Sequence, residues 1–231
     1  MKIKRHHIII CAAAFALLAA VTAVAVFSSD SQMTVSCATG TANDFEYVDM
    51  GLSVKWARCN LGATVPEEYG GLFAWGEISE KEDFSWGNYR FYLSGDVWSG
   101  NMKFSKYSVA DGGNTLKPDD DAARQILGGE WRIPTSDEVK ELIDNCSFTE
   151  VKLNGIKGMA LTSRINGNSI FLPFAGSFEQ IGSFGTGRYG NYWSSNLDKK
   201  HQYCAYILYL TNKTSLFSYG RCAGFSVRPV F

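Results

Sequence analysis

The stretch VKLNGIKGMALTSRINGNSIFL, residues 151–172, places an Asn-Gly pair between β-prone residues twice, at Asn154-Gly155 and at Asn166-Gly167. Asn-Gly readily adopts the positive φ values of a two-residue type I′ hairpin turn. Two such turns in succession predict three consecutive antiparallel strands. The centre of the chain is therefore expected to form a β-meander.

The segments on either side of this meander extend the pattern. Residues 203–210, YCAYILYL, and residues 225–231, FSVRPVF, are predicted to be strands. Two short helices are predicted before the meander. One spans residues 118–127, with acids at its start and Gly128-Gly129 at its end, and the other follows a Thr135–Glu138 capping box over residues 139–143. This order predicts an α+β fold of twisted antiparallel sheets with two short helices.

The N-terminus differs in composition from the rest of the chain. Residues 1–7 are basic, and residues 8–27 are apolar or small except for Cys11 and Thr22. Residues 1–27 are therefore expected to be a signal peptide or an uncleaved membrane anchor, followed by a linker over residues 28–43 and one domain over residues 44–231. Both alternatives export the domain to the cell envelope or cell surface. Lipidation at Cys37 is a third possibility.

The overall charge argues against one class of partner. The chain carries 22 basic and 23 acidic side chains, for a net charge of -1, and has no basic run beyond residue 7. Nucleic-acid binding is not expected, because a phosphate backbone requires a basic surface.

The motifs that suggest a metal, a cofactor or a hydrolase have simpler explanations. Three consecutive acids at residues 119–121 fit a helix start better than a calcium loop. Residues 185–190 match G-x-G-x-x-G, but no helix-forming residues follow, so a glycine-rich loop is expected. His201 lies in a polar stretch, and the chain has no G-x-S-x-G motif, so a solvated histidine is expected. We therefore expect no cofactor and no bound metal.

The cysteines allow disulfides in an exported domain. Four of them lie within residues 44–231, which leaves three possible pairings. Cys204 with Cys222 is the preferred pair, because both belong to the C-terminal strand region.

The C-terminal third is rich in Tyr, Ser, Asn and Gly, the composition of adaptable binding loops. It contains the stretch GNYWSSN, residues 190–196. We expect Tyr192 and Trp193 to point into the core and Asn196 to be the first exposed residue.

Six blocks in order resemble the Fibrobacter succinogenes major paralogous domain, a family common in exported proteins of Bacteroides-type bacteria. The blocks are YVDMGLSVKWARCNLGA (47–63), EEYGGLFAWGE (67–77), GGEWRIPTSDEVKELIDNC (128–146), NGNSIFLPFAG (166–176), GNYWSSN (190–196) and GFSVRPV (224–230). The resemblance implies a C-type lectin-like fold. Trp193 is followed by Ser194-Ser195, without the carboxylates of calcium-dependent sugar-binding lectins, so that activity is not implied.

Similar domains are diversified by retroelements in their C-terminal stretch, and this analogy implies a ligand face there for an extracellular protein or glycan. The implied ligand residues are Asn196, Asp198, His201, Asn212, Lys213, Phe217, Tyr219 and Arg221. The predicted function is therefore a non-enzymatic, exported or surface-anchored binding protein, attached to the membrane if the N-terminal segment is uncleaved.

Two alternatives remain open. One is an enzyme, either an oxidase on the similar fold of formylglycine-generating enzymes or a glycosidase using loop carboxylates. The oxidases need a closely spaced cysteine pair, whereas Cys204 and Cys222 are eighteen residues apart. The other alternative is a structural subunit of a surface assembly.

Overall fold

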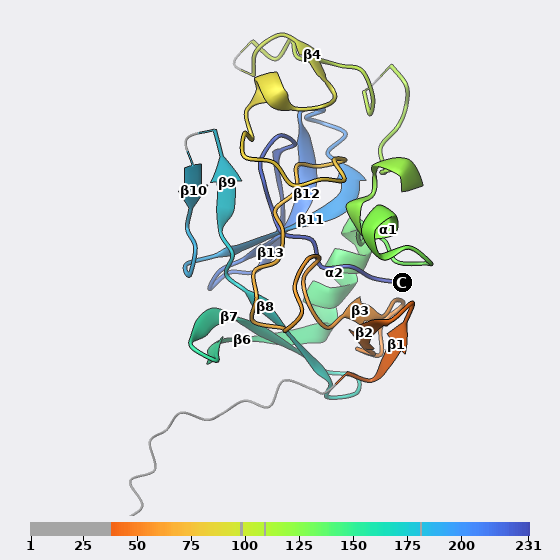
Figure 1. Cartoon of the computed structure of the whole chain (residues 1–231), viewed down its shortest axis with the longest axis vertical. Helices are drawn as coiled ribbons and strands as arrows, with labels where there is room; N and C mark the ends of the chain where they lie inside the picture. The colour runs from red at the N-terminus through yellow and green to blue at the C-terminus, as the bar shows by residue number, and fades with distance from the viewer. Residues whose placement is uncertain (1–37, 98, 109, 181) are drawn as a thin grey trace, which may run out of the picture. The chain divides into compact units, whose positions relative to one another are not determined.

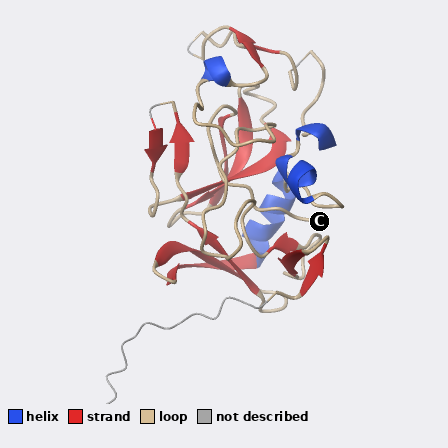
Figure 2. Cartoon of the chain, in the orientation of Figure 1, coloured by secondary structure: helices blue, strands red, loops and turns tan. Residues whose placement is uncertain are grey.

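A computed structural model of the protein describes residues 38–231 except residues 98, 109 and 181. The described part is mostly antiparallel sheet with two short helices, so the predicted α+β class is confirmed (Figures 1 and 2). The helices are η2 (Pro118–Asp120), α1 (Ala122–Leu127) and α2 (Ser136–Asn145), with a further 3₁₀ turn η1 (Trp86–Asn88). The strands are β1 (Gly40–Ala42), β2 (Phe45–Val48), β3 (Trp56–Ala57), β4 (Tyr92–Ser94), β5 (Lys103–Phe104), β6 (Cys146–Leu153), β7 (Ile156–Ser163), β8 (Ser169–Pro173), β9 (Ser177–Glu179), β10 (Gly182–Phe184), β11 (Gly190–Leu197), β12 (Cys204–Leu210) and β13 (Ser215–Gly220).

The central meander is β6-β7-β8. Its first turn is confirmed as predicted, because Asn154 and Gly155 have φ values of 48° and 86°, both in the left-handed region of a type I′ turn. The second turn differs. Only Gly167 has a positive φ, of 79°, and a longer loop joins β7 to β8. The Nδ2 group of Asn166 donates to the carbonyl of Asp49 at 2.8 Å, so a tertiary contact holds this loop.

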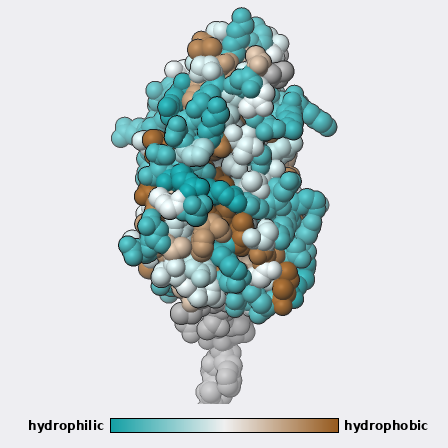
Figure 3. Space-filling view, turned by 90° about the vertical axis from the view of Figure 1, so that its right-hand side faces the viewer, coloured by the Kyte–Doolittle hydropathy of each residue, from teal (hydrophilic) through white to brown (hydrophobic). Residues whose placement is uncertain are grey.

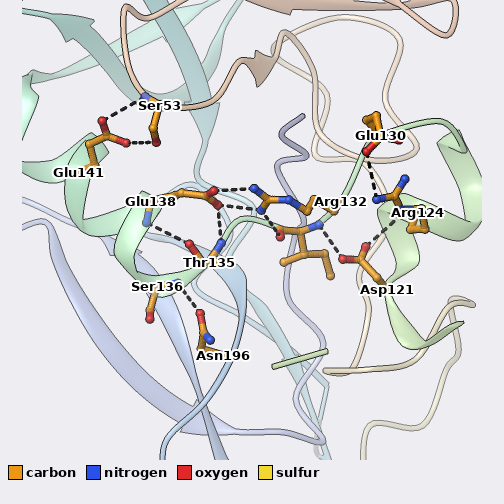
Figure 4. A network of polar contacts seen from close by, with 11 residues as sticks. Ser53, Asp121, Arg124, Glu130, Arg132, Thr135, Ser136, Glu138, Glu141 and Asn196 are labelled. Atoms are coloured by element: carbon orange, nitrogen blue, oxygen red, sulfur yellow. Dashed lines mark hydrogen bonds and ion pairs between the residues drawn. The ribbon is translucent and has the colours of Figure 1, made fainter. Parts of the chain in front are cut away.

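The predicted capping box is confirmed at α2. The hydroxyl of Thr135 accepts from the amide of Glu138 at 3.2 Å, and the Glu138 carboxylate accepts from the amide of Thr135 at 2.8 Å (Figure 4). Arg132 adds a bidentate pair to the same carboxylate, at 2.5 and 2.8 Å. The helix is longer than predicted, because the box starts it at Ser136.

The other predicted helix is divided in two. Residues 118–120 form η2, and Asp121 then caps α1 by accepting from the amide of Arg124 at 3.0 Å. Asp120 does not cap α1. Its buried carboxylate pairs with Lys106 and Arg90 and accepts from the Tyr107 hydroxyl at 2.5 Å. The three acids thus have different structural roles.

The predicted C-terminal strand over residues 225–231 is wrong. This segment makes isolated bridges to several parts of the chain instead of joining one sheet. Phe225 bridges Phe73, Ser226 bridges Tyr192, and Val230 bridges both Trp56 and Arg132. It therefore links the N-terminal sheet β1-β2-β3 to the C-terminal sheet β11-β12-β13.

The buried side chain of Arg228 connects this segment to other parts of the chain by hydrogen bonds. Its guanidinium donates to Asn60 Oδ1 and to the carbonyls of Ala57, Arg58 and Phe171, at 2.6–3.0 Å. The side chain is 1% exposed. Buried charge is tolerated where hydrogen bonds satisfy it, so Arg228 stabilises the join between three segments.

The predicted N-terminal boundaries are partly outside the described residues. The signal peptide or anchor over residues 1–27, and Cys37, lie there. The predicted linker over residues 28–43 is wrong at its end, since Gly40–Ala42 forms β1 and pairs with β2. Within the described residues, no helix has the length and apolar character needed to cross a membrane.

Candidate binding face

The sheet β11-β12-β13 separates two hydrophobic cores. Alternate residues of β12 enter different cores, with Ala205 and Ile207 in one and Leu208 and Leu210 in the other. This alternation is the period of a strand buried on both faces. Helix α2 lies against the sheet and contributes Val139 and Leu142 to the second core (Figures 1 and 2).

Tyr192 and Trp193 of β11 are core residues, as predicted. Trp193 is 1% exposed and donates its indole N–H to the carbonyl of Phe73 at 2.7 Å. Tyr192 is 2% exposed and donates its hydroxyl to the carbonyl of Pro173 at 2.6 Å. Burial raises the pKa of the Tyr192 phenol to about 12.

Four aromatic residues lie where this sheet meets the surface, and we call them the aromatic face: Tyr189, Tyr209, Phe217 and Tyr219. The ring of Tyr209 is 6.0 Å from that of Tyr189 and 6.3 Å from that of Phe217. Phe217 is 55% exposed and Tyr219 36%. The three strand residues share one side of the sheet because Tyr209, Phe217 and Tyr219 are at alternate positions of paired strands. Such a row of partly exposed rings offers apolar contact area at small entropic cost.

A carboxylate borders the aromatic face. The Tyr219 hydroxyl donates to Glu179 Oε1 at 2.9 Å, and the Ser177 hydroxyl donates to the same oxygen at 3.2 Å. Ser177 also contacts the Tyr189 hydroxyl at 3.3 Å. Burial and the Glu179 carboxylate raise the pKa of Tyr219. The face therefore combines apolar rings with an oriented acceptor.

A glycine positions the first ring of this face. Gly185 has a φ of 70°, and a Cβ atom there would lie 1.9 Å from the ring of Tyr189. Only glycine allows this approach. Residues 185–190 thus form a turn that leads into β11, which explains their G-x-G-x-x-G pattern without a nucleotide.

A second group, the Asp198 cluster, lies on the opposite side of β13 and comprises Asp198, His201, Tyr206 and Ser218. Asp198 Oδ2 accepts from Ser218 Oγ at 3.0 Å and contacts His201 Nδ1 at 2.9 Å. Tyr206 also hydrogen-bonds to the carboxylate, and its pKa is raised by burial and by Asp198. Although burial opposes ionisation of Asp198, its hydrogen bonds to His201, Lys200 and Ser218 lower its pKa.

This geometry differs from a catalytic triad. In a triad the histidine lies between the serine and the acid, so that it can remove the serine proton. Here Ser218 and His201 both contact the carboxylate of Asp198. The arrangement holds the loop after β11 against β13.

Two of the predicted ligand residues are structural. Arg221 is 0% exposed, so its predicted place on an exposed face is wrong. Its guanidinium lies 3.8 Å from the centre of the Phe104 ring and donates to the carbonyl of Tyr107 at 2.9 Å. Asn196 is half-buried and accepts from the amide of Ser136 at 2.7 Å (Figure 4). Its side-chain amide donates to Thr115 at 2.9 Å. It joins β11 to the start of α2.

The remaining predicted residues do not form one site. Asp198 and His201 precede β12, while Asn212 and Lys213 are exposed in the turn at its other end. Asn212 lines a pocket of about 250 Å³ with Phe148, Met159 and neighbouring threonines. Phe217 and Tyr219 alone belong to the aromatic face. Sequence reasoning missed Glu179, Tyr189, Tyr209 and the contacts that Ser218 and Tyr206 make with Asp198, although alternation along β12 and β13 could have identified Tyr209.

Further hollows among the described residues lie outside the aromatic face. One, of about 260 Å³, lies between Ser108, residues 112–114 and the loop after β11, where Lys199 and Gln202 line it. Another, of about 270 Å³, lies between β2, β3 and the end of α1. Figure 3 views the side that carries β1 and α1, where apolar side chains gather between hydrophilic ones in the lower half.

The predicted disulfide is not present. Cys59, Cys146, Cys204 and Cys222 are all free thiols. Burial raises the pKa of Cys204 and of Cys222 to about 12. Different charges surround these two thiols, Asp198 beside Cys204 and Lys81 beside Cys222. Both are therefore protonated and weakly reactive near neutral pH.

Within the part of the chain that the structure describes, no three His, Cys, Asp or Glu side chains gather as a metal site would require. Comparisons with protein-family models, with curated proteins and with solved structures give no match.

Proposed function

We propose that this chain is a non-enzymatic binding protein of C-type lectin-like fold, exported to the cell envelope or surface, which binds an extracellular protein or glycan through the aromatic face. The observation that carries the proposal is the row of partly exposed rings of Tyr189, Tyr209 and Phe217 beside the Glu179 carboxylate. The predicted export segment over residues 1–27 and the family resemblance are the grounds for the proposed location and fold.

The aromatic face suits a ligand with apolar patches and hydroxyl or amide donors. Rings that stack in a row provide flat apolar contact area, and a carboxylate beside them orients polar groups. Sugars and peptide segments both have this mixed chemistry. Because the supporting sheet is buried on both sides, the face is held on a rigid platform.

The contacts around the reactive groups favour binding over catalysis. The Ser218 hydroxyl donates to Asp198 and so has no histidine base. The two C-terminal thiols are held protonated by burial. The loop acids Glu67 and Glu68 are engaged by Asn154 and by Thr64. A glycosidase or a thiol oxidase would need these groups free to react.

The test is a binding screen of the intact protein against glycans and surface proteins, followed by hydrogen exchange of the complex. The proposal expects a ligand to protect amides of β12 and β13. Protection confined to the hollow between β2, β3 and α1 would contradict it. The same screen on a Tyr209→Ala variant should show weaker binding, while Leu93→Ala, a change at an exposed residue of β4, should leave binding unchanged.

A further inference from the structure

Strand β13 is an edge of its sheet, because the strand order is β11-β12-β13. The amide of Arg221 donates to the carbonyl of Tyr203 at 2.9 Å, which fixes the alternation of backbone groups along the pair. Phe217 and Tyr219 therefore direct their N–H and C=O groups toward β12, whereas Leu216 and Ser218 direct theirs away from it. Among the described residues, no strand pairs with this outer edge.

The edge lacks the features that prevent edge-to-edge pairing. Natural edge strands are usually protected by Lys, Pro or a β-bulge. The sequence of β13, SLFSYG, contains no charge and no proline, and its register with β12 is regular throughout. Phe217 and Tyr219 favour extended conformation, and Phe217 is 55% exposed. An exposed, regular and uncharged edge of this kind readily accepts another strand.

The charges at the two ends of β13 identify the strand that fits. Lys213 is exposed just before the strand, and Glu179 is held at its other end by the Tyr219 hydroxyl. An antiparallel copy of β13 reverses these ends, which brings the Lys213 of each chain toward the partner's Glu179. A strand without flanking charges of this kind would form no ion pair with Lys213 or with Glu179.

We propose that two copies of this chain associate through β13, by antiparallel pairing about a two-fold axis at Phe217. Leu216 then pairs with the partner's Ser218, and Ser215 lies opposite the partner's Tyr219. The two Phe217 side chains face each other at a non-hydrogen-bonded position, where aromatic pairs are favourable. The contact is isologous and closes as a dimer.

The dimer joins two three-stranded sheets and keeps the aromatic faces on the same side. The two faces become one continuous surface with the pair of Phe217 rings at its centre. This association does not depend on the proposed ligand, and its test uses none.

The first test is cross-linking of the full chain in membranes or detergent. Under mild oxidation, Phe217→Cys is expected to form a disulfide dimer roughly tenfold faster than Ile165→Cys, since side chains facing across a two-fold lie within disulfide range. Ile165 is a matched control, as it is 58% exposed in the β7–β8 loop and the native cysteines are common to both variants. Equal rates would overturn the proposal.

The second test is the mass of the full chain in solution. Ser218→Pro removes an amide that points away from β12, so it should give a monomer without breaking a bond within the sheet. Ser218→Ala removes the Ser218 hydroxyl, as Ser218→Pro also does, but it keeps the backbone amide. This variant should remain a dimer. A monomeric wild type, or a Ser218→Pro variant that is still a dimer, would overturn the proposal. Lys213→Glu should weaken the dimer, and Glu179→Lys added to it should restore association.

Discussion

The two buried arginines of the C-terminal segment should respond very differently to the same substitution. Arg228 has four acceptors, while Arg221 has one, the carbonyl of Tyr107. Burial lowers the pKa of both guanidinium groups. The cost of removing each one depends on the groups that it leaves unpaired.

For Arg228→Met, four acceptors lose a donor. At about 2 kcal/mol for each acceptor left unpaired the loss is about 8 kcal/mol, and removing the desolvated charge offsets about 4 kcal/mol of it, so the free energy of unfolding should fall by about 4 kcal/mol. For Arg221→Met, one acceptor left unpaired, about 2 kcal/mol, and the lost contact with the Phe104 ring, about 2 kcal/mol, are offset by the same relief of about 4 kcal/mol. The net change at Arg221 should therefore lie within about 1 kcal/mol of zero.

Urea unfolding followed by tryptophan fluorescence measures both changes, with the slope m checked for constancy. A difference of about 4 kcal/mol between the two variants is expected from these contacts. Equal losses, or a larger loss at Arg221, would mean that the number of hydrogen bonds made by a buried arginine does not decide its contribution to stability.

Three further predictions concern other parts of the structure. Thr135→Ala should lower the free energy of unfolding by about 1 kcal/mol, because one side of the capping box is lost; chemical denaturation measures this, and an unchanged midpoint would contradict it. Gly158→Ala should cost more than about 2 kcal/mol, because the new Cβ would lie 2.4 Å from the Phe171 ring, and thermal unfolding should show a clearly lower Tm. The pKa of Asp198 is lowered on folding, so its stabilising effect is complete above its unfolded pKa near 3.8 and is lost as the pH falls through the folded pKa; Asp198→Asn should reduce the acid dependence of stability, and an unaltered pH profile would count against the cluster.

Local signals predicted the elements that depend on neighbouring residues. The capping box of Thr135 and Glu138 and the turn at Asn154-Gly155 are closed by groups a few residues apart, so the sequence was sufficient for both. The prediction of a type I′ turn at Asn166-Gly167 was wrong because Asn166 donates to the carbonyl of Asp49, which lies far away in the chain. Its conformation depends on tertiary structure, which a local pattern cannot contain.

The same limit applies to the candidate site. Arg221 resembles a surface residue in sequence, yet its partners Phe104 and Tyr107 lie more than a hundred residues earlier. Asn196 is likewise held by Thr115 and Ser136. Because alternate residues of a strand lie on opposite sides of a sheet, the sequence of β13 is enough to place Phe217 and Tyr219 on one side and Ser218 on the other. This part of the aromatic face could therefore be predicted from the sequence.

If ligands bind the aromatic face, the affinity of one ligand for two surface variants should reveal it. Phe217→Ser and Ile165→Ser both remove an apolar side chain that is more than half exposed. We predict that Phe217→Ser weakens binding roughly tenfold or more, as expected for a central aromatic contact, while Ile165→Ser leaves the Kd unchanged. Unchanged affinity in Phe217→Ser, or equal losses in both variants, would contradict it.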